Sequence, residues 1–251
     1  MAGHSKWSGI KHKKAIVDAQ RGKVFTKVIR ELTSAARLGG GNPDGNPRLR
    51  LAIQKARDVN LPKDTLEKAI KRGTGELPGV AYEETVMEGY GPGGVAVLVE
   101  LLTDNKNRTS AELRSLLTRN GGSTAGAGSV SWLFQKKGVL TLNSPGLSED
   151  RLMDIVLDAG AEDLKVDGAH GTVTTTPQAL ESVKQALQNA SLPIETAELT
   201  MVPTSTVRVE DAAQAKALLA LLDAVEEHED TQHVYANFDI PDAILEAHAT
   251  S

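Results

Sequence analysis

The apolar residues of this chain change their spacing partway along the sequence. Up to residue 72 they recur every three or four positions, which is the period of an amphipathic helix. Beyond residue 81 many short stretches alternate with a period near two, which is typical of strands. The segment between them, 73–81 (GTGELPGVA), is rich in glycine and is typical of an interdomain linker. The sequence therefore predicts a small all-α module followed by a larger mixed body.

Three helices are predicted in the first module. The first covers 24–38, with an apolar stripe on one side and cations on the other. The expected inward residues are Phe25, Val28, Ile29, Leu32 and Ala36, and the expected outward cations are Lys23, Lys27, Arg30 and Arg37. A loop at 39–47 separates it from a second helix with Asn46 as N-cap, and Pro62 opens a third helix that Gly73 ends. Residues 1–23 are expected to form a flexible arm or a frayed helix.

The body alternates predicted strands and helices, with antiparallel hairpins between neighbouring strands. The expected strands are 82–88, 95–102, 129–134, 138–142, 164–167, 171–176, 196–202, 206–210 and 233–238. The expected helices are 107–119, 148–159, 177–190 and 211–226. Gly89 to Gly94 is expected to be a hairpin turn rather than a phosphate loop, because it lacks the required glycine spacing. This pattern favours an α+β, multidomain fold with two small helix-on-sheet domains in the body.

The charges divide at the same place as the periodicity. Residues 1–72 hold 17 Lys and Arg against 6 Asp and Glu, a net charge of +11, whereas residues 73–251 carry −16. A dense basic module of this kind indicates a nucleic-acid partner. The acidic body would keep the chain in solution and repel nucleic acid, or it would offer a surface for a protein partner.

Several classes of protein are disfavoured by composition. The chain has no cysteine, so disulfides, thiolate metal sites and cysteine nucleophiles are excluded. There is no run of 18 apolar residues and no secretory signal, so we expect a cytoplasmic protein without a membrane partner. Neither a Walker motif nor a G-x-S-x-G motif occurs. We therefore expect no enzyme, no catalytic residues, no cofactor and no metal.

Short motifs recur along the first half of the chain, within residues 1–138. The motifs are MAGHSKW at 1–7, KHKK at 11–14, RGK at 21–23, FTK at 25–27, NPRLR at 46–50, KRGTG at 71–75, EGYGPGG at 88–94, TDNKNRT at 103–109 and GSVSW at 128–132. Together they resemble those of the YebC/PmpR family, and the remainder of the chain is similar in layout. One departure is the stretch 121–127 (GGSTAGA), where family members often have a Gly-Asn-Leu-Gly type segment. Contacts made there by relatives are not transferred to this chain.

The resemblance implies three domains, one of which is inserted in another. On this chain they would be a basic helical domain at 1–78, an α/β domain at 79–130 plus 205–240, and an inserted α/β domain at 131–204. Bacterial members are described as DNA-binding transcriptional regulators. A mitochondrial relative activates translation of cytochrome c oxidase subunit I, and members have been linked to ribosomes and to relief of stalls at proline runs.

The basic module supplies the candidate binding residues. Cations that meet phosphates position a protein on nucleic acid without reading sequence, and an aromatic ring can stack on an exposed base. The predicted nucleic-acid-binding residues are Lys6, Trp7, Lys11, His12, Lys13, Lys14, Arg21, Lys23, Lys27 and Arg30. Packing of Trp7 on the helical module is an equally good interpretation. The helix pair in 48–72 is the nearest approach to a helix-turn-helix, but it has no set of side chains for base edges at the start of its second helix.

Two further segments could bind a ligand. In the polar run from Thr103 to Arg108, Lys106 and Arg108 would form a secondary binding loop, or Asp104, Asn105 and Asn107 would cap the following helix. His228 and His233 lie among acidic residues near the end of the 211–226 helix, where a solvated acidic helix end is the simpler interpretation than a cation site.

The sequence thus predicts a non-enzymatic nucleic-acid-binding regulator of gene expression. The family points to a DNA-binding transcriptional regulator. The alternative is a ribosome-associated translation factor that binds ribosomal RNA or tRNA and relieves stalls, which the arm-like basic N-terminus favours. A metal-dependent nuclease with carboxylates in the acidic body is a remote alternative, and a purely protein-binding adaptor is a third.

Overall fold

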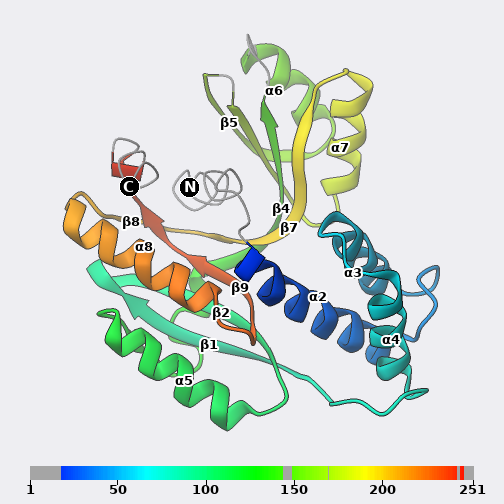
Figure 1. Ribbon diagram of the computed structural model, residues 1–251. Helices are drawn as coiled ribbons and strands as arrows, with labels where there is room; N and C mark the ends of the chain where they lie inside the picture. The colour runs from blue at the N-terminus through cyan, green and yellow to red at the C-terminus, as the bar shows by residue number, and fades with distance from the viewer. Residues whose placement is uncertain (1–17, 144–148, 169, 242–243, 246–251) are drawn as a thin grey trace. The chain divides into compact units, whose positions relative to one another are not determined.

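The computed structural model describes residues 18–143, 149–168, 170–241 and 244–245 (Figure 1). These residues form two compact units. The first comprises the described residues up to Trp132 together with those from Ser205 onward, and the second is Leu133–Thr204. The three-domain division given above, with its boundaries, stays a prediction.

The first unit begins with three helices that pack on one another. They are α2 (Asp18–Gly39), α3 (Pro47–Asp58) and α4 (Lys63–Thr74). Their shared core is aliphatic and contains Val28, Leu32, Leu49, Ala52, Ala56 and Ala69. Asn46 is the N-cap of α3, as expected: its Oδ1 accepts a hydrogen bond from the Leu49 amide at 3.0 Å, and its Nδ2 donates to the Ala35 carbonyl at 2.8 Å. One side chain therefore joins the end of α2 to the start of α3.

Helix α4 packs closely against α2 at a glycine. A Cβ at Gly73 would lie 2.4 Å from the Thr33 carbonyl oxygen and 2.7 Å from the Ala36 Cβ, so only glycine allows this approach. The expectation that Gly73 ends the helix was wrong, since α4 continues to Thr74 and Gly75 follows in the left-handed region with φ 83°. Gly73 is a packing residue rather than a terminator.

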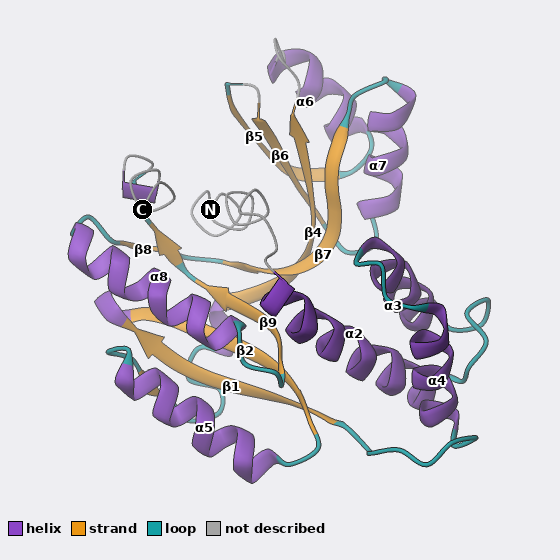
Figure 2. Ribbon diagram, viewed as in Figure 1, coloured by secondary structure: helices purple, strands orange, loops and turns teal. Residues whose placement is uncertain are grey.

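An antiparallel sheet forms the centre of the first unit. Its strands are β1 (Glu83–Gly91), β2 (Val95–Thr103), β3 (Ser123–Thr124) and β9 (Thr231–Ala236), in the order β3-β1-β2-β9. Helices α5 (Lys106–Arg119) and α8 (Ala212–Glu226) cover one face of this sheet (Figure 2). Val97 of β2, Leu113 of α5 and Leu218 of α8 belong to the apolar core between them. A separate two-stranded parallel sheet is formed by β8 (Val207–Arg208) and β10 (Phe238–Asp239).

The second unit is a four-stranded antiparallel sheet covered by two helices. It comprises β4 (Phe134–Asn143), α6 (Glu149–Asp158), β5 (Ala161–Asp167), β6 (His170–Thr175), α7 (Leu180–Asn189) and β7 (Ile194–Pro203). The strand order is β5-β6-β4-β7, and Leu140, Val173 and Val183 lie in the core. Where the chain enters and leaves, the Thr204 amide donates to the Leu133 carbonyl at 2.8 Å.

The α+β multidomain class with an N-terminal helical domain is confirmed. The strand expected at 138–142 is confirmed as part of β4, which begins earlier, at Phe134. The separate strand expected at 129–134 was wrong, because a 3-10 turn occupies Ser131–Leu133. The strand expected at 206–210 is only the two-residue β8, and β1 extends into the expected turn as far as Gly91. None of the helices described is long and apolar enough to cross a membrane.

Candidate nucleic-acid interface and its ion-pair network

The basic side of α2 faces acidic residues of the same unit. Lys23 Nζ lies 3.1 Å from a Glu227 carboxylate oxygen, and Lys27 Nζ donates to the Glu226 carbonyl. Arg30 is bonded to Asp230 and is only 8% exposed. The expectation that Arg30 lies on an exposed cationic face was therefore wrong, because its guanidinium is engaged with an acidic partner far along the chain.

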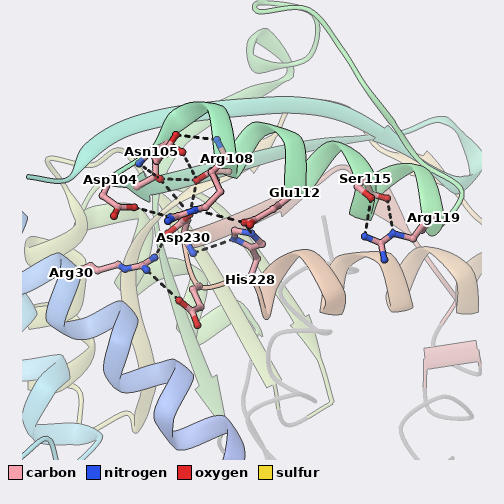
Figure 3. A network of polar contacts seen from close by, with 12 residues as sticks. Arg30, Asp104, Asn105, Arg108, Glu112, Ser115, Arg119, His228 and Asp230 are labelled. Atoms are coloured by element: carbon pink, nitrogen blue, oxygen red, sulfur yellow. Dashed lines mark hydrogen bonds and ion pairs between the residues drawn. The ribbon is translucent and has the colours of Figure 1, made fainter. Parts of the chain in front are cut away.

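Asp230 is the centre of this network (Figure 3). Its side chain is 1% exposed, and its Oδ1 accepts from Arg30. Its Oδ2 accepts from the Thr109 hydroxyl at 2.5 Å and from Arg108 Nη2 at 3.0 Å. Burial by itself raises the pKa of Asp230, but the hydrogen bonds from Thr109 and Arg108, with the charge of Arg30, hold it below the ordinary value of 3.8. The carboxylate is thus ionised and saturated with donors.

The polar run 103–108 begins at the last residue of β2, Thr103, and ends in the first turn of α5, and it supplies the cap of that helix. Asn105 Oδ1 accepts from the Arg108 amide at 3.1 Å, which confirms the capping interpretation for this residue. Arg108 also bonds to Asp104 at 2.7 Å, and Lys106 Nζ lies 2.8 Å from Glu83. An open depression of about 390 Å³ adjoins these side chains. Both cations have acidic partners here, and their role as a secondary binding loop stays a prediction.

A second set of polar contacts joins the helices to the strand region. Arg48 of α3 contacts Glu31 of α2, with Nε 2.7 Å from a carboxylate oxygen, and also pairs with Glu84 of β1. The hydrogen bond that Arg48 donates to Glu31 is the largest influence on the Arg48 pKa and raises it, although partial burial opposes this. The guanidinium of Arg30 lies 5.6 Å from the centroid of the Tyr82 ring, a cation–π contact.

Other cations of the helical domain remain exposed. They make no ion pair with another residue that the structure describes. These are Arg37 of α2, Arg50, Lys55 and Arg57 of α3, and Lys68, Lys71 and Arg72 of α4. A Cβ added at Gly73 would also lie 3.2 Å from the Arg37 backbone nitrogen. Arg37 and Arg72, the residue before Gly73, therefore both lie at the contact between α2 and α4. The candidate interface therefore lies on α3, α4 and the end of α2.

All seven of these exposed cations were absent from the predicted binding set. Their helical spacing was visible in the sequence, but nothing local distinguished them from the cations of α2 that the acidic turn engages. The predicted residues Lys6, Trp7, Lys11, His12, Lys13 and Lys14 lie outside the described residues. Arg21 belongs to α2 by its backbone, and its side chain is outside the description as well. The nucleic-acid role of all of them stays a prediction.

A histidine and two carboxylates meet beside Asp230. One ligand atom each of Glu112, His228 and Asp230 lies within 4.8 Å of the others. His228 Nε2 is 3.0 Å from Glu112, and its Nδ1 accepts from the Asp230 amide at 3.2 Å, so both ring nitrogens are occupied. Arg30 and Arg108 already supply two positive charges to the same carboxylate. This donor set suits a neutralised ion-pair network better than a divalent cation.

Two family models match the chain over nearly its whole length. One, described as the TACO1/YebC protein N-terminal domain, matches residues 5–76. The other, described as the TACO1/YebC second and third domain, matches residues 82–238. The first match covers the helical domain, and the second covers both sheets.

Relatives are similar over their full length. A protein of Syntrophobacter fumaroxidans named "Probable transcriptional regulatory protein" is 55% identical, with 98% of this chain and 99% of the relative covered. A protein of the same name from Carboxydothermus hydrogenoformans is 53% identical, with 96% and 100% covered. The crystal structure of a conserved hypothetical protein from Aquifex aeolicus, 48% identical, superposes with a TM-score of 0.78 over 93% of this chain and 96% of that one.

Proposed function

The chain belongs to the TACO1/YebC family, and we propose that it is a non-enzymatic regulator of gene expression that binds nucleic acid, with promoter DNA as the first candidate. The observation that carries this proposal is the set of exposed cations on α3, α4 and the end of α2 that form no ion pair within the described part of the chain. The names of the relatives agree with a role in transcription. The acidic body opposes non-specific contact elsewhere and so directs nucleic acid to the helical domain.

The chemistry of α4 favours contact with the nucleic-acid backbone over base reading. Its first turn carries Asp64, which would repel a phosphate at the helix N-terminus. Three of its four cations, Lys68, Lys71 and Arg72, lie in the second half of the helix, and the fourth, Lys63, is paired with Glu67. Phosphate contacts of this kind fix position and orientation but carry little sequence information. Specificity would then come from the shape of the nucleic acid or from another part of the protein.

The test is the salt dependence of binding in charge-reversal variants. Arg50→Glu with Arg57→Glu should weaken binding to a labelled duplex strongly and should lower the slope of log affinity against log salt, because fewer counterions are released. Lys216→Glu on α8 is the matched control, since it reverses an exposed cation of the acidic body. Equal loss in the control and the double variant would show that net charge alone governs binding and would refute the interface.

The basic arm is tested separately. Replacement of Lys11, Lys13 and Lys14 by Glu should also reduce affinity while the circular dichroism spectrum of the folded chain is unchanged. Unchanged affinity would assign binding to α3 and α4 alone.

A ribosome-associated translation factor is the second candidate. The absence of amide or guanidinium side chains in the first turn of α4, Lys63 to Leu66, favours it, because structured RNA is recognised largely by shape and backbone. Sucrose-gradient sedimentation of lysate distinguishes the two. Co-migration with ribosomes that RNase and high salt abolish would support the translation role, whereas promoter crosslinking without co-migration would support transcription.

The remote nuclease alternative makes a different prediction. A magnesium-dependent cleavage of bound DNA or RNA that is lost in Glu112→Gln would support it, because Glu112 is the most exposed acid of the histidine–carboxylate cluster. We propose instead that this cluster only supports the fold.

A further inference from the structure

Helix α3 exposes a stripe of mixed side chains along its whole length. With 3.6 residues per turn, Arg50, Leu51 and Gln54 fall on the same side of the helix, and Asp58 follows one turn after Gln54. All four residues are exposed, and Leu51 is 70% exposed. The buried residues of α3 lie on the opposite side, toward the helical core. We call Arg50, Leu51, Gln54 and Asp58 the outer stripe of α3.

The outer stripe contains the kinds of side chain that read base edges in the major groove of DNA. There, an arginine donates two hydrogen bonds to guanine O6 and N7, and a glutamine forms a bidentate pair with adenine. An apolar side chain packs on the methyl group of thymine. Arg50, Gln54 and Leu51 supply one side chain of each kind within about one helical turn.

Asp58 orients the amide of Gln54. Gln54 Nε2 donates a hydrogen bond to Asp58 Oδ1 at 2.9 Å. A side-chain amide carries two N–H donors and one acceptor oxygen. One N–H therefore remains to donate to adenine N7, while Oε1 accepts from adenine N6. Because the contact with Asp58 already restricts the Gln54 side chain, less conformational entropy is lost when it meets a base.

The charges of α3 complement the walls of a groove. By the same helical spacing, Lys55 lies at one border of the outer stripe and Arg57 at the other, and both are exposed. The first turn of α3 contains no acidic residue, so its positive helix end is open to a phosphate. A helix is about 10–12 Å across with its side chains, which suits a major groove about 12 Å wide.

We propose that α3 is the base-reading helix of this protein and lies in the major groove of duplex DNA, with Arg50 on guanine, Gln54 on adenine and Leu51 on a thymine methyl group. The inference rests on the proposed function and adds the form of nucleic acid and the residues that select its sequence. From Arg50 to Gln54 the helix rises about 6 Å, so the two side chains reach base pairs within about two steps of each other. The major groove of duplex RNA is too deep and narrow for side chains to read.

Selection of bound duplexes from a random-sequence DNA library tests this proposal. The wild type should enrich a short motif, and Gln54→Ala and Leu51→Ala, which change no charge, should each lose the preference at one position of it. Their affinity for the selected duplex should fall about tenfold and about threefold respectively, with affinity for a scrambled duplex within about twofold. Circular dichroism checks that both variants are folded.

The chain offers matched controls for both kinds of contact. Gln185 Nε2 of α7 donates to Asn189 Oδ1 at 3.1 Å, so Gln185→Ala removes an equivalent exposed contact from the second unit and should enrich the wild-type motif. Lys71→Ala on α4 removes a cation and should weaken binding to every duplex by a similar factor, without a change of motif.

Base analogues show the contacts themselves. Replacement of thymine by uracil removes only the methyl group, and 7-deazaguanine removes only the N7 acceptor of guanine. Uracil should weaken binding of the wild type about threefold and leave Leu51→Ala unaffected. Likewise, 7-deazaguanine should weaken binding of the wild type and leave Arg50→Ala unaffected.

The possible failures of α3 and of the proposed function are distinguishable. Duplex binding by the wild type without any enriched motif, or the same motif in both alanine variants, would overturn α3 as the base-reading helix while the proposed function stands. Tighter binding to structured RNA than to the selected duplex would also overturn it and would favour the translation candidate. Failure of the wild type to bind either nucleic acid would instead overturn the proposed function.

Discussion

Arg30 and Asp230 are 200 positions apart in the sequence and form a buried ion pair between α2 and the turn that leads into β9. Neither group is well placed alone, because an unpaired charge with 1% exposure is strongly unfavourable. The pair, with Arg108 and Thr109 around the same carboxylate, joins the helical domain to the sheet of the first unit.

Asp230→Asn should destabilise the first unit by about 3–5 kcal/mol, because it leaves Arg30 and Arg108 without their shared carboxylate. Urea denaturation followed by circular dichroism measures the change. Glu229→Gln is the control, since Glu229 is 65% exposed and contacts the same arginine at 3.3 Å, and it should cost less than about 1 kcal/mol. Similar losses in both variants would show that burial does not set the strength of the pair.

The lowered pKa of Asp230 predicts a pH dependence of stability. Its folded-state pKa lies below the ordinary 3.8, so its contribution is fully present above about pH 3.8 and is lost as the pH falls through the folded value. The difference in unfolding free energy between wild type and Asp230→Asn should therefore shrink below pH 3.8. A difference that is constant down to acid pH would contradict the assignment of the shift to this carboxylate.

Gly73→Ala should destabilise the helical domain, because the new Cβ would meet the Thr33 carbonyl oxygen at 2.4 Å. Overpacking of this kind costs about 1–3 kcal/mol or more. Gly22→Ala in α2 is the matched control: a Cβ there meets nothing within 4 Å, and alanine should stabilise the helix by up to about 1 kcal/mol. Thermal unfolding of the full chain gives both values, and a neutral Gly73→Ala would refute the close packing of α4 on α2.

Glu88→Gln should loosen the segment before Trp132. An amide keeps one acceptor oxygen but places a donor where a backbone amide of Gly128, Val130 or Ser131 requires an acceptor, at a cost of about 1–3 kcal/mol. Hydrogen exchange of these amides should accelerate. Glu198→Gln, an exposed glutamate of β7, serves as control and should leave exchange at 128–131 unchanged.

Local signals in the sequence were sufficient for most elements. Asn46 was recognisable as a cap because its partner, Leu49, is three residues away. The break expected between 134 and 138 failed because Lys136, Lys137 and Gly138 have the composition of a turn, whereas Gly138 lies within β4. A Cβ there would be 2.3 Å from Thr175 Oγ1 and 2.9 Å from the Leu180 Cβ, so tertiary packing selects this glycine.

The candidate site was harder to predict for the same reason. The helical period correctly separated Leu32 from Arg30, but it could not show that Arg30 is buried against Asp230. The period describes one helix, and the partner belongs to a distant segment. The seven exposed cations on α2, α3 and α4 that have no acidic partner among the described residues could be identified only after the other ion pairs were known.

The hydrogen bond between Thr204 and Leu133 has a consequence for how such a chain can change over evolutionary time. The first and last residues of the second unit are joined by this hydrogen bond, so the two ends of the inserted segment lie side by side. For the first unit, the insertion is therefore equivalent to a loop with closely spaced ends. Because the entropic cost of closing a loop grows only slowly with its length, an insertion at this position adds little to the entropic cost of folding the first unit.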